Sequence, residues 1–197
     1  MFTGIVEATG KIASVEIDGT NTIFWIQSSI SNELKIDQSV SHSGVCLTVD
    51  ALRDDAHRVT AVAETLSKTN LGLWREESLV NLERCMQMNG RIDGHIVQGH
   101  VDATATCTLC KDLQGSWEYH FSFNEKFAPL LIEKGSVCIN GISLTAYNVS
   151  KNEFTVSIIP YTYQHTNINE VKRNSVVNIE WDMIGKYINR IHSFQNQ

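Results

Sequence analysis

The sequence predicts an all-β protein made of two copies of one small barrel, followed by a short helix. Two observations carry this prediction. A stretch of ten residues that begins at Ser39 recurs at Ser136 with its glycine, leucine and threonine in register, so equivalent residues of the two copies lie 97 positions apart. Short runs of β-branched and aromatic residues, bounded by turn residues, occur throughout both copies and are typical of antiparallel strands.

The repeat extends over most of each copy. The segment Thr69 to Leu71 returns as Thr166 to Ile168, and Val80 to Glu83 returns as Val177 to Glu180, both at the same offset of 97. At the front of each copy, Gly4 to Thr9 matches Gly99 to Thr104 with an offset of 95, and a loop takes up the difference of two residues. A fixed internal period indicates duplicated structural units.

Individual elements can be assigned within the copies. The clearest strands are expected at Thr22 to Ile26, Val59 to Val62 and Phe154 to Ile159. One or two helical turns are expected at Ser29 to Leu34 and at Glu125 to Lys134, where apolar residues recur at three- and four-residue spacing. Many short strands within each copy favour a small closed barrel.

The chain is expected to divide into three parts: a first barrel over residues 1–94, a second over 95–183, and a C-terminal helix and tail over 184–197. The junction near Asn89 to His95 contains two glycines. The segment Ile184 to Phe194 has no counterpart in the first copy. It is expected to form an amphipathic helix that either caps the second barrel or joins subunits, with one apolar face formed by Ile184, Tyr187, Ile188 and Ile191.

Composition excludes several classes of function. The formal charge is −6, from 16 basic and 22 acidic residues without a block of like charges, so nucleic acid is not expected as a partner. No 18 apolar residues run together, and a cytoplasmic, soluble protein is expected. Five cysteines favour reduced thiols, and the Cys107 and Cys110 pair lacks the second pair that a zinc site needs, so no metal is expected.

The repeated glycine motif is the candidate binding edge of each copy. It runs from Gly44 to Thr48 and from Gly141 to Thr145, and it fits either a ligand contact or a plain hairpin corner with its leucine in the core. Polar differences between equivalent positions favour two sites with different duties. These differences are Cys46 against Ser143, Ile5 against His100, and Ser43 against Asn140.

Two histidines lie near the junction of the copies. His95 and His100 are five residues apart, which on a strand places them on opposite faces and disfavours a shared metal. His100 belongs to the front motif, so function is expected there and a structural role for His95. Lys134 is a cation in the second copy only, since its counterpart is Asp37. No phosphate loop, dinucleotide fingerprint or Ser-His-Asp order is present.

These motifs, from Met1 to Glu7 through Gly44 to Thr48, Asn81 to Arg84, Gly94 to Asp102 and Asn140 to Thr145, together resemble the riboflavin synthase family, the α-chain type with two lumazine-binding repeats. The resemblance runs to about Tyr187 and implies six-stranded Greek-key barrels and a homotrimer held by the C-terminal helix. It also implies that two molecules of 6,7-dimethyl-8-ribityllumazine exchange a four-carbon unit, without cofactor or metal, giving riboflavin and 5-amino-6-(ribitylamino)pyrimidinedione. An association with lumazine synthase is left open.

The resemblance further implies two ligand sites, with the productive site between the first barrel of one subunit and the second barrel of a neighbour. The first site would use Gly4, Ile5, Val6, Cys46, Leu47, Thr48, Thr60, Ala61, Val62, Ala63, Glu64 and Thr65. The second would use Gly99, His100, Val101, Lys134, Ser143, Leu144, Thr145, Ser157, Ile158, Ile159, Pro160, Tyr161 and Thr162.

Catalytic roles follow from the same resemblance. Ser143 and His100 would assist addition at C7 and proton transfer from the C7 methyl group, while Cys46, Ser39 and Phe2 would shape the donor side. Asn140 stands where many relatives have aspartate, and an amide can orient Ser143 but cannot take its proton. A non-catalytic lumazine or flavin carrier and a purely structural trimer module are the alternative functions.

Overall fold

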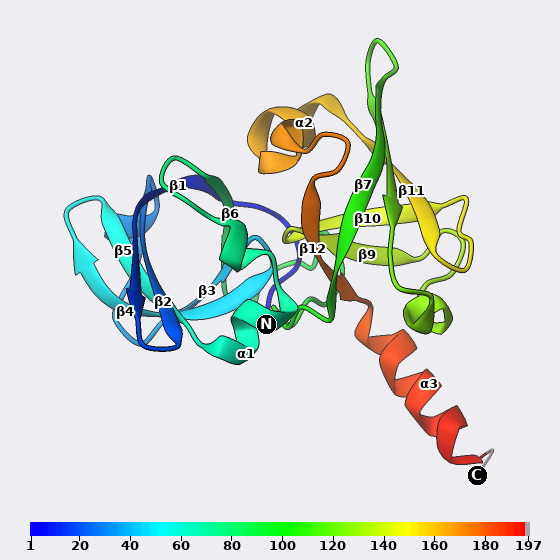
Figure 1. Cartoon of the computed structure of the whole chain (residues 1–197), viewed down its shortest axis with the longest axis horizontal. Coiled ribbons are helices and arrows are strands. Elements are labelled where there is room, and N and C mark those ends of the chain that lie inside the picture. Colours follow the sequence, from blue (N-terminus) through cyan, green and yellow to red (C-terminus); the bar gives the residue numbers. More distant parts are fainter. Residues whose placement is uncertain (196–197) are drawn as a thin grey trace.

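Two closed antiparallel barrels lie side by side in this computed structural model, which describes residues 1–195 (Figure 1). This confirms the predicted all-β fold and its duplication. The first barrel contains β1 (Ala8–Asp18), β2 (Asn21–Ser28), β3 (Ser39–His42), β4 (Val45–Arg53), β5 (Ala56–Ala61) and β6 (Leu79–Arg84). The second contains β7 (Ala103–Asp112), β8 (Trp117–Ser122), β9 (Ser136–Ile139), β10 (Ile142–Tyr147), β11 (Glu153–Ile158) and β12 (Val176–Trp181).

The two barrels share one topology. Strands follow the order β1-β2-β5-β4-β3-β6 in the first barrel, and β7, β8, β11, β10, β9 and β12 take the same places in the second. Because β5 returns to pair with β2 after the β3–β4 hairpin, the connections are of the Greek-key type. Registers agree as well, since His42 pairs with Val45 and Ile139 pairs with Ile142.

Short helices connect the strands. The expected turns before each glycine motif are 3-10 helices at Ser31–Glu33 and Glu125–Leu130. The six-residue helices α1 (Ala63–Lys68) and α2 (Pro160–His165) were not predicted, because so few residues show no clear helical period. They shorten the predicted strands to Ala61 and Ile158. Further 3-10 helices lie at Leu71–Leu73 and Asn167–Glu170.

The predicted C-terminal helix is confirmed as α3 (Met183–Gln195), which projects away from the second barrel (Figure 1). Its apolar side chains point into solvent: Ile184, Tyr187, Ile188, Ile191 and Phe194 are each more than half exposed. This face therefore does not cap the barrel. Residues 196 and 197 of the predicted tail lie outside the described residues. No helix within 1–195 has the length and apolar character needed to cross a membrane.

Each barrel has its own apolar core. The first is filled largely by aliphatic side chains such as Ile12, Val40 and Leu82, all fully buried. The second contains more aromatic rings, among them Phe154 and Trp181. Two separate clusters of buried side chains indicate two folding units that meet along a smaller interface.

The glycine motifs form the hairpin corners at that interface. Ser43 and Gly44 both have positive φ (45° and 84°), as do Asn140 and Gly141 (47° and 79°), which fits two-residue turns between β3 and β4 and between β9 and β10. The two corners abut, and a Cβ atom on Gly44 would lie 2.9 Å from the backbone nitrogen of Gly141. The hairpin interpretation is thus correct for the glycines themselves.

Repeated asparagines join the barrels around these corners. The backbone N–H of Asn167 donates to Oδ1 of Asn81 (2.7 Å), and the backbone N–H of Asn70 donates to Oδ1 of Asn178 (2.7 Å). The two bonds are equivalent under the offset of 97, so the barrels are related by an approximate twofold axis through the corners. All four asparagines are buried, and their side chains satisfy backbone groups that would otherwise lack partners.

Candidate ligand sites

Each barrel carries one cavity at an equivalent place. The larger, about 600 Å³, belongs to the second barrel and falls within the range of small-molecule sites. The smaller, about 220 Å³, belongs to the first barrel. Ser143 and Thr162 line the larger cavity where Cys46 and Thr65 line the smaller one, again 97 positions apart. The two cavities share no lining residue.

The front segments are exchanged between the barrels. The backbone carbonyl of Gly4 accepts a hydrogen bond from the N–H of Ser143 in the second barrel (2.8 Å). The carbonyl of Gly99 accepts one from the N–H of Cys46 in the first barrel (2.8 Å). The predicted grouping is therefore wrong on this point, since Ile5 lines the second-barrel cavity and His100 lines the first-barrel cavity.

Buried glutamates hold the exchanged segments. Glu83 on β6 accepts hydrogen bonds from the backbone N–H groups of Thr3 (2.6 Å) and Gly4 (3.0 Å). Glu180 on β12 accepts them from Gln98 (2.7 Å) and from the two residues that follow it. Burial raises the pKa of both carboxyl groups, against the opposing effect of these donors. Both glutamates belong to the sequence repeat, which was the available signal for them.

A histidine that was expected to be structural lies beside the second-barrel hydroxyl. Nδ1 of His95 is 2.7 Å from Oγ of Ser143. Burial lowers the pKa of His95, with Asp182 opposing, so the imidazole is neutral near pH 7 and can accept the serine proton. The strand geometry expected for His95 and His100 is wrong, because residues 94–100 do not form a strand and only Val97 bridges, to Phe2.

Asn140 does not orient Ser143. Its Oδ1 accepts the backbone N–H of Asn178 (2.8 Å), and its Nδ2 lies 3.5 Å from Oδ1 of Asn167. The side chain therefore belongs to the polar network between the barrels. The expected pairing with Ser143 is replaced by the contact from His95, and an aspartate at this position is not needed to form that contact.

Of the residues predicted to shape the donor side, only Cys46 lines the first-barrel cavity, and Ser39 and Phe2 do not. Cys46 is half-buried, and burial raises the pKa of its thiol while the Ser39 side chain opposes this through a hydrogen bond. The thiol is therefore protonated near pH 7 and is a poor nucleophile. Phe2 is fully buried, packs with Val97 and contacts Cys46 from behind the cavity.

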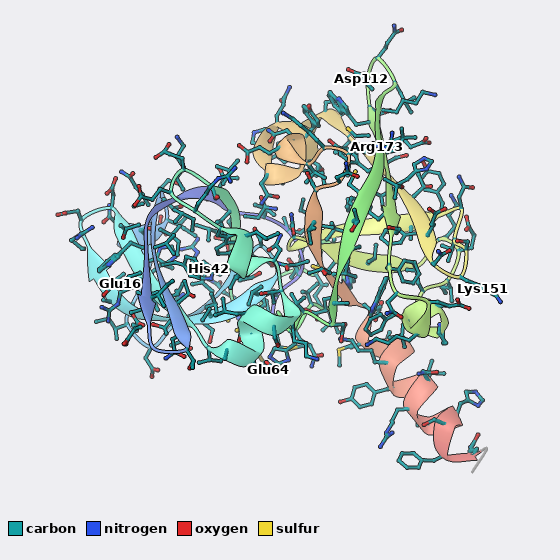
Figure 2. The ribbon with its side chains drawn as sticks, in the orientation of Figure 1. Glu16, His42, Glu64, Asp112, Lys151 and Arg173 are labelled. Carbon is teal, nitrogen blue, oxygen red and sulfur yellow. The ribbon has the colours of Figure 1, made fainter. Side chains whose placement is uncertain are left out.

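Some of the predicted binding residues line a cavity and some are buried in the barrel cores, while Val62 and Tyr161 are exposed and line neither cavity. The second-barrel cavity contains Ile5, Lys134, Ser143, Leu144, Thr145, Ser157, Ile159 and Thr162. The first-barrel cavity contains Cys46, Glu64, Thr65, Gly99, His100 and Val101, with Glu64 on α1 labelled in Figure 2. Leu47, Ala61 and Ile158 are buried in the cores instead.

Other lining residues were not predicted. Asp93, Gly94, Ser136 and Tyr147 line the larger cavity, and Val45, Lys68 and Thr69 line the smaller one. All five cysteines are free. Among residues 1–195, no three metal-ligating side chains gather in one place.

Comparison with known proteins agrees with this two-barrel construction. A family model described as the lumazine binding domain matches twice, at residues 3–85 and 98–182. Riboflavin synthase of Actinobacillus pleuropneumoniae is 40% identical over 189 residues, covering 95% of this chain and 88% of the relative. Riboflavin synthase of Bacillus subtilis (strain 168) is 38% identical over 191 residues, covering 96% and 89%.

A solved structure shows the same fold at lower identity. The crystal structure of LumP complexed with riboflavin has a TM-score of 0.87 at 18% identity, covering 92% of this chain and 99% of that one. The fold and the paired cavities thus define a protein of two lumazine-binding domains. With relatives this similar over nearly their full length, the chain belongs to the riboflavin synthase family.

Proposed function

We propose that the chain is a transferase that converts two molecules of 6,7-dimethyl-8-ribityllumazine into riboflavin and 5-amino-6-(ribitylamino)pyrimidinedione. One molecule gives a four-carbon unit to the other. The observation that carries this proposal is the pair of equivalent cavities, each formed by the glycine-motif strand of one barrel and the front segment of the other. Donor and acceptor are the same compound, so two related cavities suit the reaction.

The relative orientation of the two bound molecules accounts for much of the rate enhancement in such a reaction. Holding two reactants in a productive orientation can lower the activation barrier of a bimolecular reaction by about 7 to 11 kcal/mol. The rigid corners and buried glutamates fix the cavity walls before a ligand enters. A strongly activated side chain is therefore not required, which agrees with the protonated Cys46 thiol.

The Ser143 and His95 pair is the acid–base group of the second-barrel cavity in this proposal. The neutral imidazole accepts the hydroxyl proton as the serine oxygen approaches C7, and returns it when the adduct collapses. His100 contributes from the first-barrel cavity, where it can carry protons to and from the C7 methyl group.

A productive site between subunits brings these groups together. Ser143 and His100 line different cavities of one chain, so we infer that the first-barrel cavity of one subunit faces the second-barrel cavity of a neighbour. The exposed apolar face of α3 supports a homotrimer, since side chains such as Ile188 and Tyr187 would be buried by association.

The reaction is assigned to the cytoplasm. Exposed free thiols at Cys85 and Cys110 suit a reducing compartment. Association with lumazine synthase stays a prediction, which co-sedimentation of the two purified proteins tests.

Turnover of the purified protein tests the proposed function. The chain is incubated with 6,7-dimethyl-8-ribityllumazine, and riboflavin is followed by its absorbance. We expect one riboflavin for every two lumazines consumed. Binding of one ligand per chain without riboflavin formation would show that the protein is a carrier and not an enzyme. Absence of both binding and turnover would indicate a structural module.

A further inference from the structure

A polar relay stands on one wall of the second-barrel cavity. Tyr147 and Ser157 both line the cavity, and their oxygens are 3.0 Å apart. The Tyr147 hydroxyl also lies 2.9 Å from Oε2 of Glu118, and Oε1 of Glu118 lies 3.0 Å from Nε2 of His120. Strand pairing fixes the arrangement, because Glu118 and Ser157 are direct partners across β8 and β11.

The proton positions in this relay have only one consistent assignment. Hydrogen bonds from His120 and Tyr147 lower the pKa of Glu118, so its carboxylate can only accept. Tyr147 has a single proton and gives it to Glu118. The Tyr147 oxygen must then accept the proton of Ser157, which leaves Ser157 with lone pairs alone to offer the cavity.

The first barrel reaches the same polarity with different residues. Thr60 is equivalent to Ser157, and its hydroxyl donates to Oδ2 of Asp50 (2.7 Å), the residue equivalent to Tyr147. Asp50 is held in turn by Nε of Arg58 (2.6 Å). Neither Glu118 nor Tyr147 is repeated in the first barrel. In both barrels, however, the hydroxyl proton of Thr60 or Ser157 is donated to a protein group and not to a ligand.

We propose that Tyr147, held by Glu118, is a specificity-determining positioning residue that makes Ser157 an obligate hydrogen-bond acceptor for a donor group of the ligand, a ribityl hydroxyl or a ring N–H. Lys134 stands beside it, with Nζ 4.9 Å from the centre of the Tyr147 ring, and supplies the complementary donor. This inference rests on the proposed function for its ligand. It predicts that compounds offering only acceptors at this wall bind poorly.

A double-mutant cycle on ligand binding tests the relay. Titration calorimetry with riboflavin, the product of the proposed reaction, measures both cavities without turnover, and the first-barrel cavity serves as an internal reference. Ser157→Ala should weaken second-barrel binding about tenfold, and Tyr147→Phe about threefold, because the serine proton is then free to face the ligand donor. In the Ser157→Ala background, Tyr147→Phe should have no further effect.

Controls separate the relay from general damage. Tyr163→Phe removes a phenol hydroxyl from the same barrel at a residue that stacks on Trp117, and its binding should match that of the unmodified protein. Ser157→Thr keeps the hydroxyl and should retain binding. Additive effects of the two substitutions, or an unchanged dissociation constant in either single variant, would overturn the proposal. Failure of the proposed function appears separately, as absence of riboflavin formation by the unmodified protein.

Discussion

A fall in pH should destabilise the first barrel before the second. Two buried histidines, His42 and His57, face each other inside the first barrel with their Nε2 atoms 2.9 Å apart, and Figure 2 labels His42. His42 donates through Nδ1 to the Val40 carbonyl (3.0 Å), so its Nε2 accepts from His57, whose Nδ1 accepts from Ser31 (2.8 Å). In this arrangement both rings are neutral and every ring nitrogen has a hydrogen-bond partner.

Protonation of His42 at Nε2 places two N–H groups against each other, and protonation of His57 at Nδ1 places a charge in an apolar interior beside the Ser31 hydroxyl. Burial, and for His42 also the neighbouring ring, lowers the pKa of His42 to about 3, and burial lowers that of His57 to about 4, from an ordinary value of 6.5. Above pH 6.5 both rings are neutral whether the barrel is folded or unfolded, and the pair adds no pH dependence.

Below pH 6.5 the unfolded chain binds protons that the folded barrel does not. Stability is therefore lost as the pH falls from 6.5 towards 4 for His57 and towards 3 for His42. One pKa unit corresponds to about 1.4 kcal/mol, so at pH 5 the two groups together remove about 4 kcal/mol. A domain of this size has only about 5 to 15 kcal/mol in total.

Hydrogen exchange measured by mass spectrometry from pH 7 to pH 4.5, corrected for intrinsic exchange rates, compares the two barrels directly. The second barrel is the matched control, because Ile139 and Phe154 occupy the equivalent positions. Protection of β3, β4 and β5 should fall as the pH drops, while that of β9, β10 and β11 changes less. Glu83 in the first barrel and Glu180 in the second are equivalent, and the pKa of both is raised by burial, so their titration largely cancels in the comparison.

A double variant, His42→Ile with His57→Phe, copies the second-barrel residues and should remove the difference. Equal loss of protection in both barrels of the unmodified protein would refute the reasoning, as would an unchanged acid response in a folded double variant.

Three further predictions concern the corner, the site and the helix. Gly44→Ala should destabilise the fold by more than about 2 kcal/mol in thermal unfolding. Gly19 also has positive φ but has nothing within 4 Å of a new Cβ, so Gly19→Ala should cost about half as much. Equal losses of stability would contradict the close packing of the corners. His95→Gln should lower turnover about 100-fold with less than about a threefold change in lumazine affinity, and a purely structural histidine would instead alter both or neither. Ile188→Glu should produce monomers in sedimentation velocity, while Ser193→Glu on the same helix should not. A trimeric Ile188→Glu variant would show that the apolar face of α3 does not hold the trimer together.

The duplication, the barrels and the last helix could be predicted from sequence because each leaves a repeating pattern. The offset of 97 marks equivalent residues such as Cys46 and Ser143 without any knowledge of contacts. The exchange of the front segments leaves no such pattern. It depends on the bridge from Phe2 to Val97 and on the hydrogen bonds that Glu180 accepts from backbone N–H groups, contacts between residues far apart in the chain.

Local context misled the prediction for two polar residues. His95 lies in an irregular segment whose path is set by its backbone bond to Thr3 (3.1 Å), so strand alternation did not apply. Asn140 is adjacent to the glycine motif and was expected to serve Ser143, but its positive φ of 47° turns it into the inter-barrel network. Both outcomes were decided by the way the two barrels dock.

In the proposed trimer, the productive site joins the first-barrel cavity of one chain to the second-barrel cavity of another. A mixture of two inactive variants tests this arrangement: Ser143→Ala, with an intact first-barrel cavity, and the double variant Cys46→Ala with His100→Ala, with an intact second-barrel cavity. After subunit exchange, random pairing should restore about a quarter of the unmodified activity, because about one interface in four then combines two intact cavities. No recovery in exchanged, folded mixtures would place the site within a single chain.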